Sequence, residues 1–241
     1  MFERLRLAAV TLAGAAALVA SCAREPADEA APATPAKDAA PTPTPVATDA
    51  PAGEYRLDKS HASLIFKVDH IGYSAYKGSF DDFDATLAFD PKAPETMRVT
   101  ATISVASLDI PTPPQGFLDE LKGPAWLNAA AFPAMTFRST GVALTGPAAA
   151  RVDGELEFRG IRAPVAFDTT FNGGYAGFPP YDPNARIGFS AKGSLKRSVF
   201  GLLIGIPTPE APVGVGDDVA FEIEAEFSGP PAPQTPPPAQ Q

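Results

Sequence analysis

Apolar and polar residues alternate along most of the chain between Gly53 and Ser228. From position 219 to position 227 every odd residue is apolar, whereas three of the even positions carry glutamate. Because successive side chains of a strand point to opposite faces, this pattern indicates a strand with one dry and one solvated face. A chain that repeats the pattern has to pair its strands and bury one face of the resulting sheet.

About eight segments show this alternation, and they are spread over the whole middle of the chain: 64–68, 83–89, 99–105, 134–139, 155–159, 165–171, 187–195 and 219–227. Eight half-buried antiparallel strands favour an up-and-down barrel, which leaves no open sheet edge. The sequence therefore predicts an all-β fold, an extended eight-stranded antiparallel barrel. A two-sheet sandwich is the alternative that the pattern leaves open. A barrel of this size is either filled by its own side chains or holds one small ligand.

One short helical connection is expected to interrupt the strands. Thr112 and Gln115 have the spacing of a capping box, with Pro113 at the first helical position. Gly123 and Pro124 are expected to end the helix. The connection also carries large apolar side chains that are expected to cap one end of the barrel and to shape the mouth of a cavity: Phe117, Leu121 and Trp126.

The period of two also predicts which side chains face the barrel interior. The residues that we expect to line a lumen are Leu64, Phe66, Val68, His70, Phe117, Leu121, Trp126, Phe137 and Phe189. The chain contains sixteen Phe residues, and few polar groups fall on the inward faces. Such an interior suits a long apolar ligand, since each buried CH₂ group contributes about 0.8 kcal/mol.

Catalytic residues are sparse in the sequence. His61 and His70 are nine residues apart, so a regular strand points them to opposite faces and they cannot share one metal ion. Asp58, Ser60 and His61 are the ingredients of a nucleophile and its base, but neighbours in an extended segment are expected to diverge. The chain also lacks a Gly-rich phosphate loop and a metalloprotease helix motif. We therefore predict no enzyme, no cofactor and no metal site, with a redox accessory or enzyme that uses a histidine as an alternative.

The charge balance limits the partners of the protein. Nineteen Lys and Arg residues stand against twenty-eight Asp and Glu residues, which gives a net charge of −9. An acidic surface repels phosphate backbones, so a nucleic-acid partner is not expected. The sequence leaves a homodimer open.

Residues 1–21 have the organisation of an export signal. Arg4 and Arg6 precede an uncharged run of fourteen residues, which is shorter than the roughly 20 residues of a membrane-spanning helix. The run ends in LVASC, which resembles the lipobox of bacterial lipoproteins and contains the only cysteine of the chain. The resemblance implies cleavage before Cys22, lipidation of Cys22 and attachment to a membrane, and Ala23 in place of aspartate favours the outer membrane. A plain secretory signal with a chance cysteine is the alternative.

The segments on either side of the alternating region are rich in proline. Residues 22–52 are expected to form a Pro/Ala-rich linker behind the lipidated cysteine, and residues 229–241 a disordered tail. The barrel domain is accordingly predicted to occupy residues 53–228.

Five segments together resemble the YceI-like family of periplasmic, lipocalin-like lipid-binding proteins. They are YRLDKSH with IFKVDHIGYSAYKGSF, WLNAAAFPAMTFRS, VDGELEFRGIRAPVAF, KRSVFG and VGDDVAFEIEAEF. The resemblance implies an eight-stranded barrel whose interior holds a polyisoprenoid or a fatty acid, and it does not imply an enzyme. The expected function is that of a lipid-anchored periplasmic protein that binds a long apolar chain such as a polyisoprenoid, quinone or fatty acid. The alternative is a structural or interaction lipoprotein of the envelope with a solid barrel.

Overall fold

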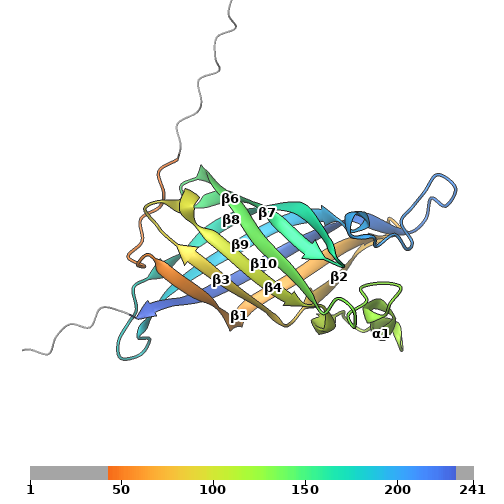
Figure 1. Ribbon diagram of the computed structural model, residues 1–241, viewed down its shortest axis with the longest axis horizontal. Coiled ribbons are helices and arrows are strands. Elements are labelled where there is room, and N and C mark those ends of the chain that lie inside the picture. The colour runs from red at the N-terminus through yellow and green to blue at the C-terminus, as the bar shows by residue number, and fades with distance from the viewer. Residues whose placement is uncertain (1–42, 232–241) are drawn as a thin grey trace, which may run out of the picture. The chain divides into compact units, whose positions relative to one another are not determined.

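The computed structural model describes residues 43–231, which form a closed antiparallel barrel with strongly tilted strands (Figure 1). The strands are β1 (Gly53–His70), β2 (Ser74–Phe80), β3 (Phe83–Phe89), β4 (Arg98–Ser104), β5 (Leu108–Asp109), β6 (Ala134–Gly146), β7 (Ala149–Phe158), β8 (Ile161–Tyr175), β9 (Asn184–Lys196) and β10 (Val215–Pro231). The described residues also contain one α-helix, α1 (Phe117–Lys122), and three single 3₁₀ turns, η1 (Pro94–Thr96), η2 (Val105–Ser107) and η3 (Arg197–Phe200).

Eight strands close the barrel in the order β1, β3, β4, β6, β7, β8, β9 and β10, and β10 pairs again with β1. β3 pairs with the first residues of β1, and β2 pairs with the last six, so β2 and β3 follow each other along the same edge of β1. β5 adds one short pairing to β2. The prediction of an all-β, eight-stranded antiparallel barrel with one short helical connection is confirmed, and the sandwich is excluded.

The two ends of the barrel differ, and each is named here by its connections. At the hairpin end, β6 turns directly into β7 and β8 is joined to β9 by residues 176–183. At the helix end lie α1, η3 and the turn between β1 and β2 (Figure 1). Each long strand runs from one end to the other, so the inward-facing residues of one strand are distributed along the whole length of the interior.

The folded unit is longer than predicted at both of its borders. Ala50 is buried, and the amide N–H of Val46 donates to the carbonyl of Pro147 at 2.8 Å. β10 continues to Pro231, where Gly229 lies so close to Tyr55 that a Cβ atom built on the glycine falls 2.1 Å from the tyrosine ring. The linker prediction is therefore wrong for residues 46–50, and the tail prediction is wrong for residues 229–231. Residues 1–42 and 232–241 lie outside the described residues.

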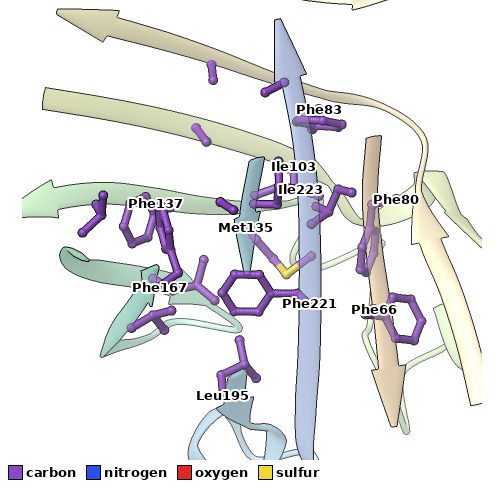
Figure 2. A pocket seen from close by; sticks show the side chains of 18 of the residues that line it. Phe66, Phe80, Phe83, Ile103, Met135, Phe137, Phe167, Leu195, Phe221 and Ile223 are labelled. Atoms are coloured by element: carbon purple, nitrogen blue, oxygen red, sulfur yellow. The ribbon is translucent and has the colours of Figure 1, made fainter. Parts of the chain in front are cut away.

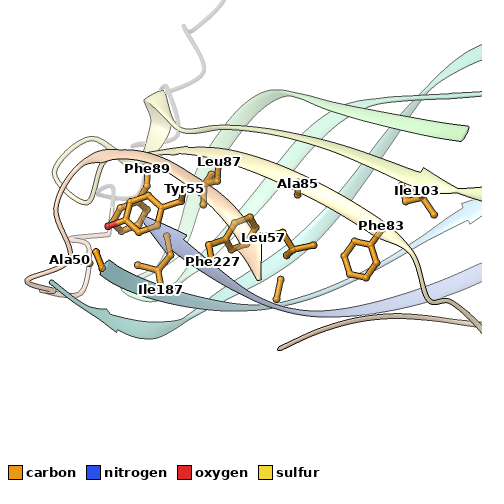
Figure 3. Close-up of a cluster of buried hydrophobic side chains, with 12 residues drawn as sticks. Ala50, Tyr55, Leu57, Phe83, Ala85, Leu87, Phe89, Ile103, Ile187 and Phe227 are labelled. Carbon is orange, nitrogen blue, oxygen red and sulfur yellow. The ribbon is translucent and has the colours of Figure 1, made fainter. Parts of the chain in front are cut away.

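One end of a buried cluster explains these longer borders, because Ala50, Tyr55, Phe89 and Phe227 pack together at the hairpin end (Figure 3). Tyr55 is fully buried there, its ring meets Phe89 edge-on at 5.3 Å, and its hydroxyl donates to the Pro51 carbonyl at 2.8 Å. Burial raises the pKa of Tyr55 to about 12. Since a buried hydroxyl needs a partner, the segment that supplies Pro51 has to pack against the barrel.

The helix begins later than the capping-box spacing predicted. α1 starts at Phe117, after Gly116 in the left-handed conformation with φ of 79°, and it ends at Gly123 as expected. Thr112 itself has φ of 47°, which is unlike the extended backbone of an N-cap residue. The physical reason is the second proline of the pair: Pro114 disfavours the helical region for the residue before it, so Pro113 is a poor first residue of a helix.

Candidate ligand-binding cavity

The barrel is hollow. Its interior contains a cavity of about 970 Å³ that reaches from Val46 and Pro147 at the hairpin end to α1 and Leu202 at the helix end. Figure 2 shows side chains from several strands, among them Phe167 and Phe221, that line this space. The volume lies within the range of small-molecule sites. It is inconsistent with a barrel that its own side chains fill completely.

All nine residues that the sequence predicted as lumen lining are placed on the cavity wall. Leu64, Phe66, Val68 and His70 come from β1, and the others come from β6, β9, α1 and the segment after α1: Phe137, Phe189, Phe117, Leu121 and Trp126. The period of two therefore predicted the inward-facing residues of β1, β6 and β9, whereas Phe117, Leu121 and Trp126 were predicted as apolar side chains of the helical connection. Contact of these side chains with a ligand stays a prediction.

The cavity wall is also built from residues that the prediction did not single out. Most of them share the same alternating pattern and come from the dry faces of β3, β4, β8 and β10: Phe83, Ala85, Leu87, Phe89, Val99, Ala101, Ile103, Phe167, Phe171, Phe221 and Ile223. A second group, Pro45, Val46 and Thr48, precedes β1 and closes part of the hairpin end. No periodicity marks that group, because these residues belong to no strand.

Glycines on neighbouring strands hold several aromatic rings against the wall. Phe66 pairs directly with Gly78, and a Cβ atom built on that glycine falls 2.4 Å from the phenylalanine ring. Gly193 lies between Phe167 and Phe221 in the sheet, and its Cβ position is 2.5 Å from the Phe221 ring. A ring that occupies the place of a missing side chain lies along the wall rather than across the lumen. Glycine at these positions therefore keeps the interior open while the wall stays aromatic.

The most buried charge of the described residues is at the helix end. Arg197 is only 6% exposed, and its guanidinium donates hydrogen bonds of 2.8 Å to the carbonyls of Leu202, Ile204, Val215 and Gly216. Burial lowers the pKa of Arg197, and the nearby carboxylate of Asp217 opposes this shift. One arginine thus joins the connection that follows η3 to the start of β10.

The other residues of the KRSVFG segment also make structural contacts at the helix end. The backbone N–H and the hydroxyl of Ser198 both donate to Asp217 at 2.8 Å. Phe200 is buried, and Gly201 takes a positive φ of 74° that ends η3. The Arg197 cation also lies 5.9 Å from the centre of the Trp126 ring. The KRSVFG segment therefore has a structural role: its hydrogen bonds and buried side chains hold the helix end of the barrel together.

The two histidines are separated as predicted. His70 lines the cavity near the helix end, with its ring 5.9 Å from that of Tyr76. His61 lies on the outer surface and is mostly exposed. They do not share a site, and the described residues contain no group of three or more His, Cys, Asp or Glu side chains suited to a metal ion.

The expected divergence of Asp58, Ser60 and His61 is wrong. The Ser60 hydroxyl donates to Asp58 at 2.6 Å, and His61 Nδ1 lies 3.1 Å from Asp58 Oδ2 and 3.2 Å from Ser60 Oγ. The cause is a bulge in β1: Leu57 pairs with Phe227 but Ala62 pairs with Ala225, so the strand is locally longer than its partner. The same bulge moves the inward face from odd to even positions.

This cluster has the geometry of a structural network and not that of a catalytic triad. A triad uses both ring nitrogens of the histidine, one toward the nucleophile and one toward the carboxylate, whereas Nδ1 of His61 faces both groups here. Hydrogen bonds from Ser60, Arg186 and His61 hold the pKa of the Asp58 carboxyl well below its ordinary value. Arg186 also pairs with Asp182 at 3.0 Å, which ties the outer wall of the hairpin end together.

Comparison with known proteins places the barrel in a family. A model of the YceI-like domain matches residues 55–227, which is most of the described chain. The chain belongs to the YceI-like family. Among YceI-like relatives, a UPF0312 protein of Pseudomonas fluorescens is 35% identical over 153 residues, covering 63% of this chain and 77% of that protein. One of Pseudomonas savastanoi pv. phaseolicola is 33% identical over 178 residues, covering 73% of this chain and 88% of that protein.

Solved structures show the same YceI-like barrel. A YceI protein of Campylobacter jejuni is 28% identical with a TM-score of 0.55, covering 66% of this chain and 88% of its own. BcnA of Burkholderia cenocepacia is 24% identical with a TM-score of 0.60, covering 70% and 98%. A polyisoprenoid binding domain of Saccharophagus degradans is 11% identical with a TM-score of 0.53, covering 74% and 99%. At these last two identities the likeness establishes the fold alone.

Within residues 43–231 no helix has the length and apolar character that crossing a membrane requires.

Proposed function

We propose that this protein binds one long apolar molecule, such as a polyisoprenoid, a quinone or a fatty acid, inside the barrel. The observation that carries the proposal is the cavity of about 970 Å³ with an almost entirely apolar wall. The name of the Saccharophagus degradans domain, a polyisoprenoid binding domain with a similar barrel, supports the same ligand class. Catalysis is not part of the proposal. The polar side chains that come together on the outer wall, Asp58, Ser60, His61 and Arg186, bind one another through hydrogen bonds and ion pairs.

The distribution of polar groups in the wall suits a chain with a polar terminus. Thr48 and Arg98 border the cavity at the hairpin end, and His70, Tyr76 and Arg197 border it at the helix end. Between them the wall is formed mostly by phenylalanine and aliphatic side chains. A hydrocarbon chain bound in the middle of the cavity would remove apolar surface of both the ligand and the protein from water. This burial contributes about 0.8 kcal/mol of binding free energy for each CH₂ group.

Extraction of the purified protein tests the ligand proposal. We expect organic solvent to release an apolar molecule that mass spectrometry identifies, and we expect the extracted protein to unfold at a lower temperature. A ligand present at a hundred times its Kd stabilises the folded state by about 2.7 kcal/mol. Adding back undecaprenol, ubiquinone or palmitate should restore the melting temperature for the class that binds. An extract without apolar molecules, together with no stabilisation by any of the three probes, contradicts the proposal.

We further propose that the protein is anchored in the periplasm through lipids on Cys22, with the outer membrane favoured. The support is the LVASC sequence around the only cysteine, which lies outside the described residues. Stable anchoring needs two or more acyl chains, which lipoprotein processing supplies.

The substitution Cys22→Ser tests the anchor. We expect osmotic shock to release the Cys22→Ser protein, whereas the wild type should sediment with membranes and partition into detergent. Separation of inner and outer membranes should place the wild type in the outer fraction. If wild type and Cys22→Ser are released equally, the plain secretory signal is the correct alternative.

A further inference from the structure

Exposed apolar side chains gather at the helix end of the barrel. They come from the turn between β1 and β2, from η3 and from the connection between η3 and β10, and we call them the rim surface: Tyr73, Val199, Leu203, Ile204 and Val213. Tyr73 is 87% exposed, Val213 73% and Leu203 64%. Between positions 198 and 214 the only charged residue is Glu210. An exposed apolar surface of this kind marks an interaction site.

Backbone hydrogen bonds hold these segments together. The N–H of Ile71 donates to the Gly214 carbonyl at 3.0 Å, and the N–H of Val215 donates to the Gly205 carbonyl at 2.7 Å. Arg197 adds its hydrogen bonds to the carbonyls of Leu202 and Ile204 from the inner side. The rim surface is therefore held in place at the helix end by these backbone hydrogen bonds and by the hydrogen bonds of Arg197.

On the side of Ile204 the rim surface adjoins the cavity wall. Ile204 is partly exposed and also lines the cavity, and its neighbours Leu202 and Gly205 line the cavity as well. The guanidinium N–H groups of Arg197 are hydrogen-bonded to the backbone carbonyls of Leu202 and Ile204 there. An apolar chain that crosses the barrel end at this place keeps apolar contacts on its way.

We propose that the rim surface inserts into a lipid bilayer, and that the apolar ligand passes across it between the bilayer and the cavity. The second half of this statement rests on the proposed function, since only a ligand that is insoluble in water needs such a route. A bilayer fits the side chains, because tyrosine and aliphatic residues are favoured at the membrane interface and interior. Charge is sparse between positions 198 and 214, where Glu210 is the only charged residue, and this favours a lipid surface over a protein partner with a polar rim.

The hairpin end supplies a matched control. Phe178 is 64% exposed, like Leu203, and its ring stacks on that of Tyr181 with centres 5.8 Å apart. Neither aromatic residue lines the cavity. Asp182 follows directly and pairs with Arg186, so this exposed pair lies beside charged groups. Phe178 is therefore as exposed as Leu203 but lies away from the cavity. A comparison of the two positions distinguishes nonspecific hydrophobic binding from docking through the rim surface.

The test measures sedimentation of the full chain with phosphatidylcholine vesicles. Each protein carries Cys22→Ser, which removes the predicted anchor. We expect Leu203→Asp and Val213→Asp each to weaken binding on the order of tenfold, the effect of withdrawing one aliphatic side chain from an apolar contact. Phe178→Asp should bind like the parent protein. Binding should also persist at high salt, since no ion pairs with lipid are involved.

Several results overturn the docking proposal. They are equal binding by all variants, loss of binding on Phe178→Asp alone, or absence of binding by the parent protein. A parent dimer that Leu203→Asp dissociates, with no vesicle binding, assigns the rim surface to a second copy of the chain instead. Thermal unfolding checks that Leu203→Asp and Val213→Asp are folded, and Tyr73→Asp tests the surface from the separate β1–β2 turn.

Ligand content, measured on the same samples, distinguishes the two proposals. Vesicle binding that depends on Leu203 in a protein without an extractable ligand supports docking and contradicts the proposed function. If every variant contains an extractable ligand and Leu203→Asp binds vesicles like the parent protein, the result supports the proposed function and overturns docking. When both proposals hold, Leu203→Asp should slow the transfer of labelled palmitate from vesicles to the delipidated protein.

Discussion

Replacement of Ala191 by tryptophan is expected to expel the bound ligand while the barrel remains folded. Ala191 lies on β9, lines the cavity and is only half-buried although it points into the barrel. Its methyl group therefore borders open space. An indole at this position occupies volume that the ligand needs, whereas the empty protein has room for it.

The amount of co-purified ligand and the stability of the delipidated protein are the two readouts. We expect Ala191→Trp to retain less than about one tenth of the wild-type ligand, a loss of about 1.4 kcal/mol or more in binding. Unfolding of the delipidated variant should differ from that of the delipidated wild type by less than about 1 kcal/mol. Overpacking of a solid core costs about 1–3 kcal/mol instead.

Two further variants control this experiment. Ala220→Trp places the same side chain on the exposed outer face of β10 and should leave the ligand content unchanged. Ala101→Trp adds bulk from β4 at an independent position of the cavity wall and should repeat the effect of Ala191→Trp. Full ligand content in Ala191→Trp, or a large destabilisation of its ligand-free form, contradicts a ligand site in the lumen.

The walls of the cavity could be predicted from the sequence because a single physical rule controls them. A strand that separates water from an apolar interior must alternate, so Phe66, Phe137 and Phe189 were assigned to the interior without knowledge of the partner strands. Their convergence on one cavity followed from closure, which the number of half-buried strands favoured. Whether the interior is hollow was not predictable, because it depends on glycines such as Gly193 that remove side chains opposite the aromatic rings.

The local irregularities could not be predicted from the same rule. The bulge between Leu57 and Ala62 depends on the register with β10, which no property of β1 alone specifies. It changed the inward parity and brought Asp58 and His61 together, against the expectation of an extended strand. The packing of Val46 against the barrel was missed for a related reason, since its composition resembles that of the proline-rich segment before it.

Removal of Arg197 should have the largest effect on stability. Its guanidinium donates to four backbone carbonyls from two separate segments, at a position that is 6% exposed. Arg197→Leu leaves these carbonyls without a donor, and each buried polar group without a partner costs about 1–3 kcal/mol. Because water at the mouth can satisfy part of them, we expect a loss of about 3 kcal/mol or more in the free energy of unfolding.

Lysine should not rescue this position, and that comparison identifies the cause. Arg197→Lys keeps the positive charge, but an ammonium group is a single point with three donors and cannot reach four carbonyls that surround a planar fork. Chemical denaturation should therefore show both variants well below wild type. Arg151→Leu is the control, because Arg151 pairs with Asp153 on the exposed surface and should change stability by about 0.5 kcal/mol at most. If Arg197→Lys is as stable as wild type, charge alone matters, and the hydrogen bonds to the carbonyls do not hold the helix end.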